Sequence, residues 1–585
     1  MGWVALLAAV VSAMGGAARL FSYSEHPAHK FTARAMMHGA LNLRRGLLGV
    51  GHDEQIFNGA GYTNWGFGVP LLQIPFHAIA LLFRKRFAGA PYFPDRAIFL
   101  FYTALALPIL WTGIRRMLYA PAPANGDRAV TTARTVWGAM EPWVVSWSLT
   151  MLVVAFTLGD LTSYRFIVYE ETIAYFVLFE LLAVGCYAHW LTGRRLAWAA
   201  AAAFAAATAT LIRPTGAPYM LVWLPLLWLE RRDARTALTV LSAAAPPLVF
   251  WLYSNWARCG AFLSPGFQNA LPAYYFHFSM QRFGSVCNDS ARHTADNALA
   301  MLRMLFIGRP DTTPAQAGCG FLFEKRIYDS VPFLSPVALL VMVLDLGGWV
   351  FSRPRKASEL LPHLGFALVF FLYLSAGAGL SYRYAGDFWP LVVLIGLQGL
   401  RRADLGRASL APALAFACVF FAYVRFEQDI WPALRTLNPI PAARMSALAA
   451  DYEHTEAQAQ PAVDATIACG ASLPNWLRAD GVGWFPDCAV GPATNLYVGL
   501  PKGGGRGRYR LRLEADFAGP DVRVMFNGAL YVAHWNGDAY IADLRLDPSR
   551  FHTPVAMLTI QWSRNVASER LRPVVHLRRV TLETA

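Results

Sequence analysis

Long apolar runs separated by short polar connections dominate the first 425 residues. One of these runs, 67–83, contains Pro70, Gln73, Pro75 and His77, so it fits an interfacial or re-entrant helix as well as a span. The other runs have the length and composition of membrane-spanning helices, once short ones are extended by their flanks. These eleven predicted spans lie near 3–22, 97–114, 136–157, 172–190, 196–212, 217–229, 236–253, 333–351, 361–380, 388–400 and 408–424.

The pattern changes near residue 465. Stretches 508–517, 522–526 and 539–546 alternate apolar and polar positions and are separated by turn signals such as Asn527-Gly528. Short alternating runs at this spacing predict an antiparallel β-sandwich. The intervening residues, 426–464, indicate a linker. We therefore divide the chain into a membrane domain (1–425), a linker (426–464) and a β-sandwich (465–585).

Composition agrees with this division. Apolar residues make up 56% of the chain and charged residues only 15%, against about 25% in soluble domains. That balance excludes a soluble cytosolic enzyme, a disordered chain and a disulfide scaffold. The predicted fold class is an α-helical polytopic membrane protein with a C-terminal extracytoplasmic β-sandwich. The basic residues are dispersed over loops, so no nucleic-acid partner is predicted.

Topology accounts for most of the net charge of +14. With a cytoplasmic N-terminus, five connections face the cytoplasm and hold 15 Lys and Arg against 5 Asp and Glu. The larger outer segments are then 23–95, 254–332 and the tail. Arginine outnumbers lysine 46 to 5, as in GC-rich bacterial genomes, so we expect a bacterial inner-membrane protein. Cys469 with Cys488, and Cys287 with Cys319, are possible disulfides on the outer side.

Four short motifs resemble the GT-C superfamily of polytopic glycosyltransferases. They are Ala33–Leu41, Gly66–Leu72, the Arg-Pro-Thr-Gly at 213–216 and the SYRYAGDFWPLVVL at 381–394. The resemblance covers roughly 1–425 and rests on the order of the motifs and their side of the membrane. It implies transfer of a sugar from a polyprenyl-phosphate donor to a cell-envelope glycan, lipid or protein on the outer face of the inner membrane, with inversion.

Such chemistry needs a carboxylate base near the acceptor hydroxyl. The resemblance favours Glu25, just after the first predicted span, although His26 stands where many relatives carry a second acid. Asp53 and Glu54, later in the same loop, are the alternatives. An ordinary solvated carboxylate, or a turn between Gly51 and Gly59, would equally explain these positions.

Arginines at outer span ends are candidates for the leaving phosphate, because a guanidinium binds phosphate oxygens bidentately. Arg213 and Arg383 are our candidates, with Arg snorkelling to the interface as the ordinary explanation. Asp160 and Glu171 are candidates for the donor site or for a divalent cation, Mg²⁺ or Mn²⁺, although no spacing demands a metal. Tyr62 and Trp65 are candidates for stacking on sugar rings.

Two other functional classes fit the sequence less well. One is a transporter or flippase of lipid-linked sugars, but the acids gather at outer span ends and no internal repeat is evident. The other is a membrane-anchored glycan-binding or assembly protein, in which the tail alone would act.

Overall fold

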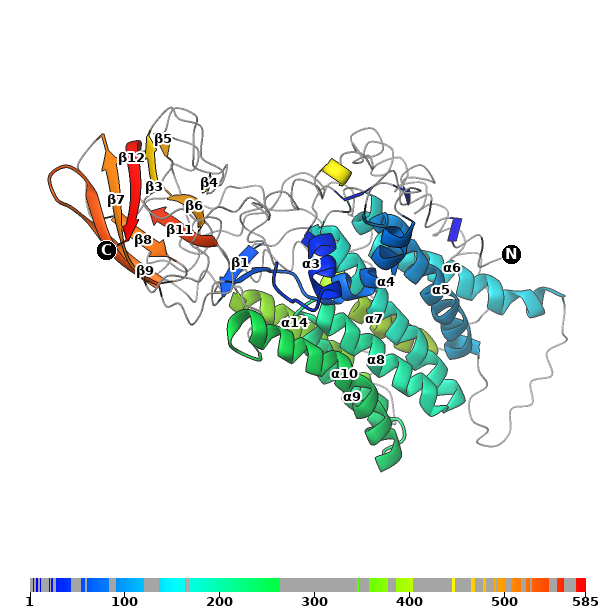
Figure 1. Ribbon diagram of the computed structural model, residues 1–585. Coiled ribbons are helices and arrows are strands. Elements are labelled where there is room, and N and C mark those ends of the chain that lie inside the picture. Colours follow the sequence, from blue (N-terminus) through cyan, green and yellow to red (C-terminus); the bar gives the residue numbers. More distant parts are fainter. Residues whose placement is uncertain are drawn as a thin grey trace, which may run out of the picture.

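The computed structural model describes helical segments in the first 402 residues and strands in the tail (Figure 1). The described residues are 4, 7, 8, 11, 20, 21, 23, 24, 28–43, 54–57, 60–83, 91–119, 136–163, 166, 168–263, 342, 345, 346, 357–376, 386–402, 445–447, 465–468, 477–479, 489–490, 493–499, 507–516, 522–526, 529–546, 555–561 and 575–584.

Every predicted apolar run between residues 97 and 253 coincides with a helix, as do 361–380 and 388–400. The predicted runs 3–22, 333–351 and 408–424 lie wholly or largely outside the described residues, so the number of spans stays a prediction. The helices are α3 (Ala28–Met37), α4 (Gly68–Leu82), α5 (Asp95–Tyr119), α6 (Val136–Ser163), α7 (Val168–Gly193), α8 (Leu196–Ile212), α9 (Gly216–Leu229), α10 (Ala234–Cys259), the 3₁₀ turn η6 (Ala357–Glu359), α14 (Leu361–Ala376) and α15 (Trp389–Arg402).

Local chemistry explains where these helices begin and end. Asp233 caps α10, because its carboxylate accepts a hydrogen bond of 2.6 Å from the backbone N–H of Thr236. The same helix ends at Gly260, whose φ of 71° is the left-handed conformation that glycine adopts most easily. In α4, Pro70 lies in the first turn, where a missing N–H costs nothing.

Among the described residues, three helices are long and apolar enough to cross a membrane: α5, α7 and α10, over Asp95–Tyr119, Glu170–Gly193 and Ala234–Arg258. Helix α4, with 15 residues and a length of about 22 Å, is shorter than a membrane core of about 30 Å. The described part of residues 1–402 is therefore mostly helical and includes helices long and apolar enough for a membrane protein.

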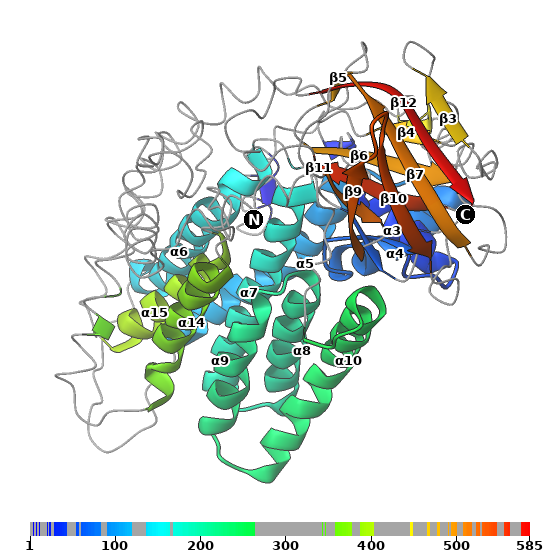
Figure 2. The same cartoon turned by 90° about the vertical axis from the view of Figure 1, so that its left-hand side faces the viewer.

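Helix α7 is the centre of the bundle. It is buried along 94% of its apolar stretch, whereas α10 is buried along only 22%. Figure 2 shows α7, α8, α9 and α10 running alongside one another. Helices α5 and α7 approach closely at two glycines, where a Cβ added to Gly113 would lie 2.6 Å from the carbonyl oxygen of Gly185. Small residues permit such backbone contact between membrane helices.

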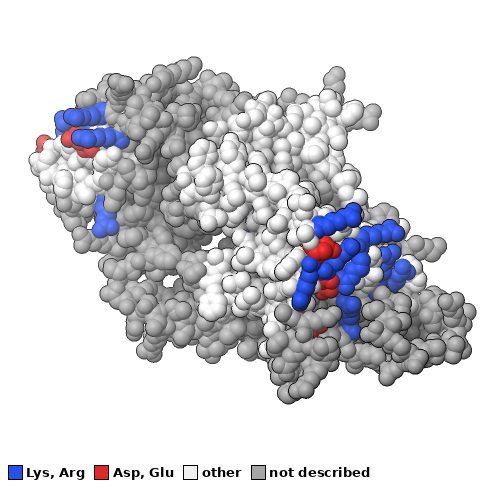
Figure 3. Space-filling view, turned by 90° about the horizontal axis from the view of Figure 1, so that it is seen from below, with Lys and Arg blue, Asp and Glu red and all other residues white. Residues whose placement is uncertain are grey.

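Arginines gather at one end of this bundle, where Figure 3 shows a basic surface interrupted by a few acids. They come from the C-terminal ends of α5 and α15 and from the α7–α8 and α9–α10 connections. These belong to four of the five connections predicted to face the cytoplasm. The membrane side on which they lie stays a prediction.

The tail forms a ten-stranded antiparallel sheet with the strand order β3-β12-β7-β10-β9-β8-β11-β6-β4, and β5 pairs with β12. Strand β9 changes partner along its length, pairing with β8 over Ala529–Ala533 and with β10 at His534 and Trp535. Strands on either side of β9 in this order contribute to one apolar core, which includes Leu511 and Ile560. The sheet region is confirmed, while its division into two sandwich layers stays a prediction. The strands are β3 (Ala465–Ala468), β4 (Leu477–Ala479), β5 (Ala489–Val490), β6 (Ala493–Gly499), β7 (Gly507–Ala515), β8 (Val522–Phe526), β9 (Ala529–Trp535), β10 (Tyr540–Leu546), β11 (Val555–Gln561) and β12 (Val575–Thr584).

Candidate functional site

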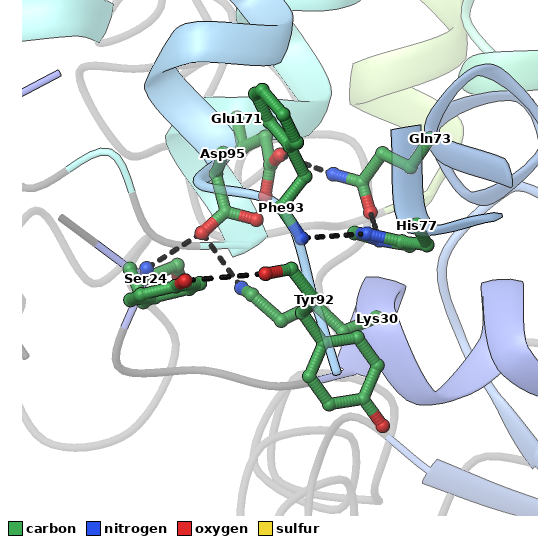
Figure 4. Close-up of polar contacts among 9 residues, drawn as sticks. Ser24, Lys30, Gln73, His77, Tyr92, Phe93, Asp95 and Glu171 are labelled. Atoms are coloured by element: carbon green, nitrogen blue, oxygen red, sulfur yellow. Dashed lines mark hydrogen bonds and ion pairs between the residues drawn. The ribbon is translucent and has the colours of Figure 1, made fainter. Parts of the chain in front are cut away.

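A buried ion pair joins the first predicted outer loop to the start of α5 (Figure 4). The ammonium Nζ of Lys30, on α3, lies 2.7 Å from Oδ2 of Asp95, and each side chain is only 1% exposed. The backbone N–H of Ser24 donates to the same oxygen at 2.7 Å. Asp95 is the first residue of α5, where the helix dipole favours negative charge. The residues just after the first predicted span are thereby held against α5.

Tyr23 strengthens this attachment. Its hydroxyl donates to the backbone carbonyl of Tyr92 at 3.1 Å, one turn before α5 begins. Burial, and then the nearby charge of Asp95, raise the pKa of the Tyr23 phenol to about 12. Both effects disfavour the phenolate, so Tyr23 stays a hydrogen-bond donor throughout the physiological pH range.

A second chain of contacts connects α4 to α7. The backbone N–H of Phe93 donates to Nδ1 of His77 at 3.1 Å, which makes Nδ1 an acceptor. The imidazole proton therefore lies on Nε2, which contacts Oε1 of Gln73 at 3.3 Å. The Gln73 amide then donates to Oε1 of Glu171 at 2.7 Å. The direction of this chain follows from its first donor, and it ends on a carboxyl group that is 1% exposed.

The two sets of contacts form one polar cluster, which we call the loop-anchoring cluster: Ser24, Lys30, Gln73, His77, Asp95 and Glu171. Figure 4 shows five of these side chains converging from α3, α4, α5 and α7, beside the backbone N–H of Ser24. A further contact joins α3 to α7, where Nε2 of His29 lies 2.9 Å from the hydroxyl of Thr172. Charged groups this deeply buried are costly unless paired, so the cluster fixes where the loop docks on the helix ends.

A second buried ion pair joins α8 to the segment before α15. Nε of Arg213 lies 2.7 and 2.8 Å from the two carboxylate oxygens of Asp387, which is fully buried. The hydroxyl of Tyr219 donates to the backbone carbonyl of Asp387 at 2.7 Å. The motif of residues 381–394 is therefore attached at Asp387 to the α8–α9 corner.

Arg258, near the C-terminal end of α10, holds the stretch that leads into α4. Its guanidinium donates at 2.9 Å to the carbonyl of Trp65 and at 3.4 Å to that of Thr63. Gly66 packs so tightly against the end of α8 that an added Cβ would lie 2.5 Å from the carbonyl oxygen of Leu211. The backbone around the predicted stacking residues is thus held by α8 and α10.

The structure describes only some of the predicted site residues, and these lie in separate groups of contacts. Glu171 lies in the loop-anchoring cluster, Arg213 in the Asp387 pair, Tyr62 is buried and Trp65 is half-buried. Glu25, Asp53 and Arg383 lie outside the described residues. Glu54 belongs to the hairpin strand β1 (Glu54–Phe57), paired with β2 (Ala60–Thr63), and Asp160 belongs to α6, but their side chains lie outside the description. The cysteines of both predicted disulfides also lie outside it.

Sequence reasoning missed Lys30, Asp95 and Asp387. Asp387 belongs to the motif of residues 381–394, in which Arg383 was the predicted site residue. Gln73 and His77 interrupt an apolar run, and the sequence alone assigned them no role. That interruption was the available signal, because polar side chains on an apolar helix usually face a partner.

In the part of the chain that the structure describes, no three His, Cys, Asp or Glu side chains are grouped so as to hold a metal ion. The divalent cation predicted at Asp160 and Glu171 therefore stays a prediction, because the side chain of Asp160 is not described.

Comparisons with known proteins are sparse. No protein-family model and no curated protein matches the chain. Seven chains of solved structures match. One is the cryo-electron microscopy structure of the arabinosyltransferase EmbB from Mycobacterium smegmatis, with a TM-score of 0.29 and 11% identity. The match covers all of this chain and 64% of that one. A likeness of this strength says nothing about the function of this chain.

Proposed function

We propose that the protein is a membrane glycosyltransferase that moves a sugar from a polyprenyl-phosphate donor to a cell-envelope glycan, lipid or protein. The observation that carries the proposal is the loop-anchoring cluster. It docks the first predicted outer loop onto the ends of α5 and α7 that lie opposite the arginine-rich end. An acid-bearing loop held at the membrane surface is what transfer from a lipid-linked donor requires.

Glu25 is the proposed base. It follows Ser24 directly, and the backbone N–H of Ser24 is bonded to Asp95. The attachment point of Glu25 is therefore set by the loop-anchoring cluster, within one residue. Glu25 takes the proton of the acceptor hydroxyl as its oxygen attacks the anomeric carbon. The bond from that carbon to the phosphate oxygen breaks, and its electron pair leaves with the polyprenyl phosphate.

The leaving phosphate needs cations. Arg383 lies four residues before Asp387 in the sequence, so the Arg213–Asp387 pair sets where the chain bearing Arg383 is attached. We assign phosphate binding to Arg383, with Arg213 holding the segment and contributing positive charge. Asp160 and Glu171 remain proposed for the donor side of the site, and Tyr62 and Trp65 for stacking on sugar rings. Attack opposite the phosphate would invert the anomeric centre.

The decisive experiment compares Glu25→Gln with Glu25→Asp in the full chain, reconstituted with a panel of polyprenyl-phosphate pentoses and hexoses. The two readouts are the release of polyprenyl phosphate and the transfer of labelled sugar to an envelope extract. Loss of the base should slow turnover by about 10²- to 10⁴-fold, with partial recovery in Glu25→Asp. The matched control is Asp543→Asn, the same change of charge at an exposed acid of the tail.

Asp53→Asn and Glu54→Gln are measured alongside. Full activity of Glu25→Gln, with loss in either of these variants, would move the base to the later acids. If the lipid-linked sugar crossed the bilayer of a proteoliposome and no sugar were transferred to an acceptor, the protein would be a transporter and not an enzyme.

A further inference from the structure

The arginine-rich end of the bundle is a built surface rather than a scatter of loop charges. Among the described residues it gathers eight arginines from four separate parts of the chain, against the acids Glu230, Asp233 and Glu359. Figure 3 shows this basic surface on one face of the molecule. We call it the arginine surface: Arg115, Arg116, Arg194, Arg195, Arg231, Arg232, Arg235 and Arg401.

Only part of this charge is neutralised within the protein. Arg194 lies 3.5 Å from the carboxylate of Glu230 and donates to its backbone carbonyl at 2.9 Å. Arg231 lies 2.6 Å from the carboxylate of Asp233. Both arginines remain exposed, as do Arg195, Arg232, Arg235 and Arg401. The surface therefore keeps an excess of positive charge available to an outside anion.

The backbone adds an independent observation. Arg194 and Arg232 adopt positive φ angles of 50° and 56° in the α7–α8 and α9–α10 connections. Glycine adopts this backbone conformation without strain, whereas a residue with a Cβ atom is strained in it. Two arginines of this surface therefore have an unfavourable backbone conformation, and residues with such strain are often found at functional sites.

Apolar surface lies directly beside these charges. On α10, Leu238 is 69% exposed and Leu241 is 55% exposed, within two turns of Arg235. With 26 residues, α10 is about 39 Å long, against about 30 Å for a membrane core. Its first turn then lies at headgroup level while its leucines face the acyl chains. One molecule with an anionic head and apolar tails matches both parts.

We propose that the arginine surface binds anionic phospholipids of the leaflet it faces, through Arg231, Arg232 and Arg235 at the headgroup and the exposed face of α10 at the acyl chains. A soluble anion would find the arginines but leave the leucines uncovered. Attraction of lysine and arginine side chains to an anionic leaflet is strong enough to give about a fivefold preference per residue.

The test titrates the full chain in detergent with phosphatidylglycerol or phosphatidylcholine of the same acyl chains. Bound lipids are counted by native mass spectrometry, and the midpoint of thermal unfolding is followed. We expect phosphatidylglycerol to bind at least about tenfold more tightly, and the preference to shrink as salt is added. Equal binding of the two lipids, or a salt-independent preference, would overturn the proposal.

Variants locate the site. Arg231→Gln, Arg232→Gln and Arg235→Gln together should abolish most of the preference. The matched control changes three exposed arginines of the tail to glutamine: Arg508, Arg545 and Arg578. Because removing positive charge can also disturb insertion, the three lysine replacements are tested too, and they should retain the preference. Glycerol phosphate, the headgroup without tails, should not raise the unfolding midpoint; a rise equal to that with phosphatidylglycerol would refute a lipid site.

Discussion

Replacing Lys30 with methionine would remove the ammonium and leave most of the side-chain volume. Lys30 and Asp95 are both 1% exposed, and Oδ2 of Asp95 would then keep only the 2.7 Å bond from the N–H of Ser24. A carboxylate buried without its cation cannot regain water. The lost stability should therefore come from the stranded charge more than from the lost attraction.

The size of the effect follows from burial. Breaking a buried ion pair on one side costs about 3–5 kcal/mol, a factor of about 10²–10⁴ in the folding equilibrium. The tail supplies the comparison: Arg510 lies 3.1 Å from Asp543, but these side chains are 54% and 67% exposed. Breaking an exposed pair costs about 0–1 kcal/mol. Lys30→Met should thus destabilise the protein several times more than Arg510→Met.

The assay is unfolding of the full chain in mixed detergent micelles, with the four variants of a double-mutant cycle for each pair. Lys30→Met combined with Asp95→Asn should recover much of the loss, because no unpaired charge remains. If Lys30→Met cost no more than Arg510→Met, Lys30 and Asp95 would have to be solvated. The claim that this ion pair anchors the first loop would then be wrong.

Two further predictions concern the same region. Gly66→Ala should destabilise the protein by about 1–3 kcal/mol, since its Cβ would lie 2.5 Å from the carbonyl oxygen of Leu211; Gly193→Ala, whose Cβ would meet nothing closer than 3.8 Å, is the control in the same unfolding assay. The raised pKa of Tyr23 should make the free energy of unfolding fall as the pH rises from 10.0 towards about 12, because the phenol loses its proton first in the unfolded chain. Unfolding midpoints of Tyr23→Phe should fall less over that interval, and parallel curves for the two proteins would contradict the raised pKa.

The sequence predicted the helices well and the site poorly, and the reason is physical. Apolar length identifies a membrane helix locally, and loop charge orients it, so α5 to α10 and the arginine-rich end followed from the pattern. The pairs that build the site join distant positions: Gln73 and Glu171 are 98 residues apart, and Arg213 and Asp387 are 174 apart. Nothing local specifies such partners, because each depends on which helix ends meet.

The contact between Arg258 and the backbone of Thr63 and Trp65 bears on how the protein is made. The donor follows its acceptors by 195 and 193 residues, so those carbonyls leave the ribosome long before the guanidinium exists. Until α10 has inserted, the carbonyls must be satisfied by water. The stretch at 63–65 therefore makes its final contacts late in biosynthesis. A chain truncated before residue 258 should leave this stretch more open to proteases than the full chain does.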